Sequence, residues 1–122
     1  MNDAKTVLVV DDSRVSRLMA RQFILTKRPG WLVEEAATGE EALVEVQSMT
    51  SPTLILVDVN VPGMGGLAAA GHLRAMCPQA HISLVTANVQ NTTRNRATEM
   101  GIGFMEKPIT EARIDALLGA LE

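Results

Sequence analysis

Residues 53–66 read TLILVDVNVPGMGG, and this stretch decides the fold. Four aliphatic residues lead directly to Asp58, and Pro62 with three glycines then turns the chain. An aliphatic run without polar alternation is typical of a strand that is covered on both faces. The segment therefore predicts a buried strand that ends at a carboxylate and is followed by a sharp turn.

The rest of the chain repeats this pattern, because short apolar runs alternate with segments of helical character. Ser13, Thr38 and Thr110 are suited to begin three of the helices, and Gly101 is suited to end another. The expected strands are 6–10, 31–36, 53–57, 81–87 and 101–106, and the expected helices are 13–27, 39–48, 65–76, 91–100 and 110–121. This order predicts an α/β fold, a doubly wound sheet of five parallel strands with five helices, in one domain spanning residues 1–122.

Composition excludes several classes of protein. The net charge is −3 and aromatic residues make up only 2%, so neither a basic nucleic-acid surface nor a set of stacking platforms is expected. No apolar stretch approaches the roughly 20 residues that span a bilayer, and the N-terminus lacks a signal-peptide pattern. Cys77 is the only cysteine, so no internal disulfide can form. We therefore expect a cytoplasmic protein with no direct nucleic-acid binding and no membrane insertion.

Polar residues gather where the expected strands end. Asp11 and Asp12 follow the first strand, Asp58 follows the third, Thr86 lies at the end of the fourth, and Lys107 follows the fifth. In open parallel sheets, ligands bind outside the carboxyl ends of the strands. Three neighbouring carboxylates stay ionised together only beside a cation, and their hard oxygens suit Mg²⁺, or Mn²⁺ in its place.

The same residues suggest a reaction. Lys107 offers a compact positive charge to a phosphate oxygen, and Thr86 offers a hydroxyl donor. These parts position and neutralise a phosphoryl group while a nucleophile attacks it in line. Because no serine, cysteine or histidine is suitably placed, Asp58 is the candidate nucleophile.

Four motifs identify a family that the chain resembles. They are VVDDS (9–13), VDVNVPGMGG (57–66), VTA (85–87) and FMEKP (104–108). Together they resemble the response regulator receiver domain of the chemotaxis type, over essentially the whole chain. The resemblance implies a flavodoxin-like fold and a role in two-component signalling. It also implies that a histidine kinase, a histidine phosphotransfer protein or a small acyl phosphate phosphorylates Asp58. Such a domain is a signalling phosphoacceptor that catalyses its own phosphorylation and dephosphorylation, and is not classed as an enzyme.

The resemblance also assigns metal ligands. Asp12 would be the main carboxylate ligand of Mg²⁺, with Asp11 close by and acting partly through water. Asp58 and the backbone carbonyl of Asn60 would complete the protein ligands.

A switch and an output surface follow from the same resemblance. Thr86 would reorient toward the phosphoryl group, Phe104 would swing inward, and Lys107 would pair with the phosphoryl oxygens. The bond before Pro108 would be cis. An effector protein would bind the fourth helix, fifth strand and fifth helix, within residues 91–121.

The sequence departs from the family at three positions. Val61 replaces a frequent methionine, and Gly65 replaces a frequent Asp or Asn at the start of the third helix. Phe104 lacks the hydroxyl of the tyrosine that is common at its position. Phe104 therefore cannot make an output contact that needs this hydroxyl.

Other interpretations remain open at this point. The chain could be a receiver domain cut from a longer regulator or hybrid kinase, or a phosphate-independent interaction module. An aspartyl-phosphate hydrolase would share Asp58 and the metal, but it needs a second acid where this chain has Asn60. Finally, Arg14, Arg17, Arg21 and Arg28 fall on one stripe of the first helix, which is either a solvated face or a docking site for an acidic partner.

Overall fold

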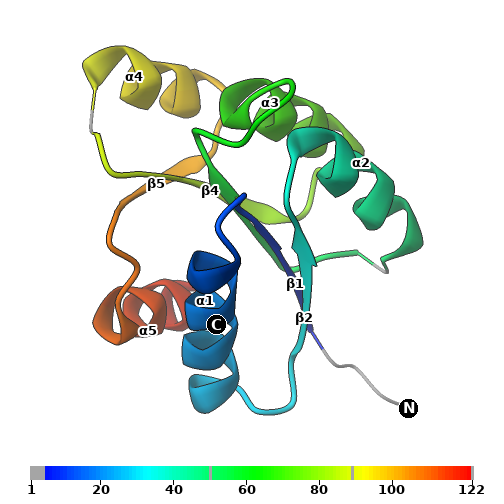
Figure 1. The fold of residues 1–122 in the computed structure, drawn as a ribbon, viewed down its shortest axis with the longest axis vertical. Helices are drawn as coiled ribbons and strands as arrows, with labels where there is room; N and C mark the ends of the chain where they lie inside the picture. The colour runs from blue at the N-terminus through cyan, green and yellow to red at the C-terminus, as the bar shows by residue number, and fades with distance from the viewer. Residues whose placement is uncertain (1–4, 50, 89, 122) are drawn as a thin grey trace.

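A computed structural model describes residues 5–49, 51–88 and 90–121, which form one sheet covered by helices on both faces (Figure 1). The strands are β1 (Thr6–Val10), β2 (Leu32–Ala36), β3 (Leu54–Asp58), β4 (His81–Thr86) and β5 (Gly103–Glu106). The helices are α1 (Arg14–Lys27), α2 (Gly39–Ser48), α3 (Gly66–Met76), α4 (Asn91–Glu99) and α5 (Glu111–Ala120). All neighbouring strands are parallel, and their order is β2-β1-β3-β4-β5. The predicted doubly wound α/β fold is confirmed.

Two apolar layers hold the helices on the sheet. Alternate residues of the inner strands point to opposite faces, so Leu54 and Leu56 pack with α1 and α5, whereas Ile55 and Val57 pack with α2, α3 and α4. Figure 1 shows α1 and α5 on one side of the sheet and the other three helices on the opposite side. Because β1, β3 and β4 are covered on both faces, their sequences are aliphatic without alternation.

Side chains begin three of the helices as predicted. The hydroxyls of Ser13, Thr38 and Thr110 each accept a hydrogen bond from the backbone amide three residues further on. Helix α3 begins differently, because Gly65 precedes it with φ at 84° and ψ at 160° and provides no side-chain cap. That backbone conformation is essentially reserved for glycine.

The fifth strand is shorter than the sequence pattern predicted. Gly101 has a φ of 69°, and its amide donates to the carbonyl of Thr98. The amide of Ile102 donates to the carbonyl of Ala97. This pair of bonds is a Schellman motif, so residues 101 and 102 end α4 instead of beginning β5. Trp31 likewise precedes β2 and is not part of it. Within the described part of the chain, no helix has the length and apolar character needed to cross a bilayer.

Candidate functional site

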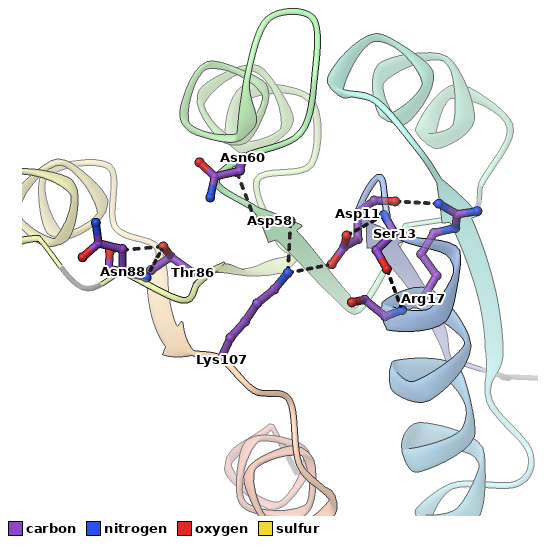
Figure 2. Close-up of polar contacts among 9 residues, drawn as sticks. Asp11, Ser13, Arg17, Asp58, Asn60, Thr86, Asn88 and Lys107 are labelled. Atoms are coloured by element: carbon purple, nitrogen blue, oxygen red, sulfur yellow. Dashed lines mark hydrogen bonds and ion pairs between the residues drawn. The ribbon is translucent and has the colours of Figure 1, made fainter.

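The centre of the site is a lysine between two buried carboxylates. Asp58 is the last residue of β3, Asp11 directly follows β1, and Lys107 directly follows β5. The Lys107 ammonium donates to Asp58 Oδ2 at 3.1 Å and to Asp11 Oδ2 at 3.2 Å (Figure 2). Asp11 and Asp58 are only 3% and 5% exposed, so the lysine supplies the positive charge that two buried carboxylates require.

A third carboxylate joins this pair at the surface. Oxygen atoms of Asp11, Asp12 and Asp58 lie within 4.8 Å of one another, and Asp12 is exposed. All three donors are hard carboxylate oxygens, which fit a cation such as Mg²⁺ better than a metal that prefers nitrogen or sulfur ligands. The strand ends therefore form an acidic pocket suited to a divalent cation.

The electrostatic environment of the pocket is set by burial and by Lys107. Burial raises the pKa of the Asp11 carboxyl, and the charge of Asp58 adds to this effect, while the Ser13 amide and Lys107 oppose it. Burial alone would lower the pKa of Lys107, but its hydrogen bonds and charge interactions with Asp58 and Asp11 raise it. Lys107 is therefore a permanent ammonium at neutral pH.

The turn after β3 fixes Asp58 from the other side. The Asn60 amide donates to Asp58 Oδ1 at 3.1 Å, and the Gly66 amide donates to the Val59 carbonyl at 3.0 Å. A Cβ on Gly66 would collide with the Asp58 carbonyl and would lie 2.6 Å from the Val59 Cα. The glycine at this position therefore lets α3 begin directly against the backbone that carries Asp58. The Asn60 side chain points away from Lys107 (Figure 2).

Thr86 is not part of this hydrogen-bonded cluster. In the described part of the chain, its hydroxyl donates to the Asn88 carbonyl at 3.2 Å and accepts from the Asn88 amide at 3.1 Å (Figure 2). The side chain is buried at the end of β4, on the face that also carries Ile82 and Leu84. Its hydroxyl is thus engaged in the loop that leads to α4.

Phe104 lies on the same face of the sheet as Thr86. Its half-buried ring packs against the core beneath α2, α3 and α4, and the Arg94 guanidinium lies 5.4 Å from the ring centroid. This cation–π contact links β5 to α4.

An arginine that sequence reasoning missed supports the loop of Lys107. The Lys107–Pro108 peptide bond is cis. Arg113 of α5 donates to the Glu106 carbonyl at 2.9 Å and to the Pro108 carbonyl at 2.7 Å, on either side of the lysine. No sequence pattern singles out this arginine, because its role depends on how α5 is placed next to the loop.

Arg17 fits neither interpretation of the arginine stripe on α1. Its side chain is only 16% exposed and donates from Nε to Glu35 Oε1 at 2.9 Å and from Nη1 to the Asp11 carbonyl at 2.7 Å. Arg21 donates to the other oxygen of Glu35 at 2.8 Å. Arg17 therefore binds β2 and the β1–α1 loop and does not belong to a solvated face or a free docking stripe, whereas the side chain of Arg21 binds β2 and stays 42% exposed. The signal in the sequence was Glu35, an acid on the α1 face of an edge strand.

Comparisons with known proteins agree with this fold and place the chain in a family. A family model for the response regulator receiver domain matches residues 7–119. Chemotaxis protein CheY of Halobacterium salinarum is 30% identical over 120 residues, which cover 97% of this chain and 98% of that protein. Transcriptional activator protein ExaE of Pseudomonas putida is 33% identical over 107 residues, which cover 87% of this chain. The chain matches only 50% of the length of ExaE.

Solved structures give the same result. A response regulator protein from Burkholderia pseudomallei, solved with a phosphorylated aspartic acid, a calcium ion and citrate, superposes with a TM-score of 0.77 at 27% identity. The alignment covers 97% of this chain and 66% of that one. The chain therefore belongs to the response regulator receiver family, the class of domain that serves two-component signalling.

Proposed function

We propose that this receiver domain accepts a phosphoryl group on Asp58 from a histidine kinase or a histidine phosphotransfer protein, and that this modification changes the surface that an effector protein binds. The observation that carries the proposal is Lys107, which lies 3.1 Å from Asp58 and 3.2 Å from Asp11 at the carboxyl ends of the strands. A buried carboxylate beside a fixed ammonium and two further carboxylates is suited to accept a charged group that arrives with a cation.

Mg²⁺ is the cation that we propose for this pocket. Asp11, Asp12 and Asp58 would hold it, together with the backbone carbonyl of Asn60. When bound, Mg²⁺ would neutralise charge on the phosphoryl oxygens and on the carboxylates around them.

In the reaction, a carboxylate oxygen of Asp58 attacks the phosphorus atom of the donor. A bond forms between this oxygen and phosphorus, and the bond from phosphorus to the donor nitrogen or oxygen breaks, leaving its electron pair on the donor. The Lys107 ammonium, already 3.1 Å from Asp58 Oδ2, would then contact a phosphoryl oxygen. The Asn60 amide holds the other carboxylate oxygen during the approach.

The proposed switch starts at Thr86, whose hydroxyl is bonded to Asn88 and not to the cluster around Asp58. The Thr86 hydroxyl would leave Asn88 and donate to a phosphoryl oxygen of modified Asp58. Phe104 would follow, because space opens on its face of β5, and its contact with Arg94 would change. The surface of α4, β5 and α5 would then bind an effector with altered affinity.

Helix α1 offers an apolar surface to the phosphodonor. Val15, Leu18 and Met19 are 66%, 47% and 43% exposed, and they lie on one side of the helix at helical spacing. Met19 also lines a surface pocket together with Lys107 and Ile109. We propose that the donor protein binds at this apolar surface and not through the arginine stripe, for which a docking role was one of the two interpretations of the sequence.

The test is incubation with acetyl phosphate and Mg²⁺, followed by measurement of intact mass. We expect one added phosphoryl group in the wild type and none in Asp58→Asn, with Asp115→Asn as the control for loss of a surface acid. Absence of any adduct with acetyl phosphate and with phosphorylated phosphotransfer proteins would contradict the proposal. Repeated turnover of a phosphoester would instead favour the hydrolase.

A further inference from the structure

We propose that Arg17 is a positioning residue that holds the cation-binding loop in place by fixing the Asp11 carbonyl. The inference rests on the proposed function, because it assumes that Asp11 and Asp12 bind a divalent cation. It assigns to the arginine a role in metal affinity that its place on a helix surface does not suggest.

The geometry of Arg17 is that of a clamp between two elements. Its Nη1 donates to the Asp11 carbonyl at 2.7 Å, and its Nε donates to Glu35 Oε1 at 2.9 Å. The first contact reaches the loop between β1 and α1, as Figure 2 shows, and the second reaches the edge strand β2. Because a guanidinium is planar and rigid, fixing one nitrogen on Glu35 also aims the other at the carbonyl.

Glu35 is held firmly enough to act as the anchor of this clamp. Arg21 donates to its second oxygen at 2.8 Å, so both carboxylate oxygens are bound. Burial by itself raises the pKa of Glu35, but the hydrogen bonds and charges of Arg17 and Arg21 outweigh it and hold the pKa below its usual range. The anchor is therefore ionised at neutral pH.

The position of the Asp11 carbonyl affects the positions of both Asp11 and Asp12. A peptide unit is planar, so fixing the Asp11 oxygen also fixes the nitrogen of Asp12. The Ser13 amide donates to Asp11 Oδ1 at 2.9 Å, which ties the side chain of Asp11 to the same turn. Loss of the clamp would therefore loosen two ligands at once.

Electrostatics and positioning predict opposite effects for removal of Arg17. Loss of a nearby positive charge should favour binding of a cation by Coulomb's law. Loss of the clamp should weaken binding, because the ligands are no longer pre-organised. Arg21 is the matched control, since it lies one turn further along α1 and shares Glu35 but contacts only Glu35 in this cluster.

The experiment is calorimetric titration of Mg²⁺ into the wild type, Arg17→Gln, Arg17→Lys and Arg21→Gln. We expect Mg²⁺ affinity to fall about tenfold in both Arg17 variants, as for other residues that orient metal ligands. In Arg21→Gln we expect equal or tighter binding. An affinity in Arg17→Gln equal to or tighter than that of Arg21→Gln would overturn the proposal.

A second readout needs no metal. Amide exchange of Ser13 should speed up more in Arg17→Gln than in Arg21→Gln, which keeps the bond from Arg17 to the Asp11 carbonyl, while urea unfolding verifies that both variants are folded. Equal exchange in the two variants would also overturn the clamp. A wild type that binds no Mg²⁺ would instead contradict the proposed function, so the two failures are distinguishable.

Discussion

Asp58 and Thr86 lie at the ends of neighbouring strands, yet their side chains are bound in different ways. Both oxygens of Asp58 accept hydrogen bonds inside the site, from the Asn60 amide and from Lys107. The Thr86 hydroxyl is bonded instead to Asn88 in its own loop. The reason is strand alternation: Asp58 lies on the face of Leu54 and Leu56, and Thr86 lies on the opposite face.

This difference in bonding fits two different tasks, which are accepting a phosphoryl group and sensing it. An acceptor has to be pre-organised, since charge stabilisation is effective only where the groups are already in place. A sensor has to have a second position available, because a switch needs two arrangements of similar free energy. The first requirement is met by Asp58 with its partners Lys107 and the Asn60 amide, which we call the acceptor half of the site. The second is met by Thr86 with its partner Asn88. Mutations in the two halves should therefore differ in kind.

The largest expected effect comes from Gly66→Ala in the acceptor half. The added Cβ would meet backbone atoms of Asp58 and Val59, which cannot move without displacing β3. We expect the free energy of unfolding to fall by about 3 kcal/mol, at the upper end for overpacking. Gly119→Ala is the control, because nothing lies within 4 Å of its Cβ position. Urea unfolding of both variants measures the difference, and equal stabilities would show that the β3–α3 contact is not tight.

The second effect comes from Lys107→Gln. Removing the ammonium leaves Asp11 and Asp58 without their cation, so we expect a loss of about 2 kcal/mol in metal-free buffer, less than for a fully buried pair because Lys107 is 22% exposed. Millimolar Mg²⁺ should restore part of this loss. Lys27→Gln is the control, since its partner Glu111 is at the surface and such pairs contribute at most about 1 kcal/mol. Urea unfolding with and without Mg²⁺ measures both effects. An unchanged stability in Lys107→Gln would mean that the acceptor half is not held by this lysine.

The third effect comes from Thr86→Val, which keeps the shape of the side chain and removes its hydroxyl. The bonds to Asn88 are lost, which should cost about 1 kcal/mol. Because the hydroxyl is bound outside the acceptor half, we expect an adduct with acetyl phosphate to form still, without the change in the spectrum of Phe104 and α4. Intact mass and NMR measure the two outcomes. A loss of adduct as complete as in Asp58→Asn would place Thr86 in the acceptor half after all.

The fold and the composition of the site could be predicted from sequence for one physical reason. In a parallel sheet the strand ends share an edge, so Asp11, Asp58 and Lys107 had to lie together once the strands were recognised. The orientation of Thr86 could not be predicted, because the partner of a hydroxyl depends on the path of the following loop.

Contacts between different helices and strands could not be predicted from the sequence either. The role of Arg17 depends on the register of β2 beside β1, in which Glu35 lies opposite Val9. The role of Gly66 depends on how closely α3 approaches β3. Both are consequences of packing, which a pattern of apolar residues along the chain does not contain.

The smallest expected effect comes from Glu35→Gln, through the pH dependence of its free energy of unfolding. Glu35 supports the site indirectly, because it binds Arg17, which in turn binds the Asp11 carbonyl. The pKa of Glu35 is lower in the folded protein than in the unfolded chain, so its stabilising effect is present above the unfolded pKa and is lost as pH falls through the folded one. We expect the variant to be less stable than the wild type by about 0.5–1 kcal/mol at pH 7, since the side chain is partly exposed. The difference should shrink as the pH falls below about 4.3, the usual pKa of a glutamate, because both carboxyl states then approach the uncharged glutamine. Urea unfolding at pH 7, 5 and 3 measures the difference. A difference that stays constant over this range would mean that packing, and not charge, makes Glu35 the anchor of Arg17.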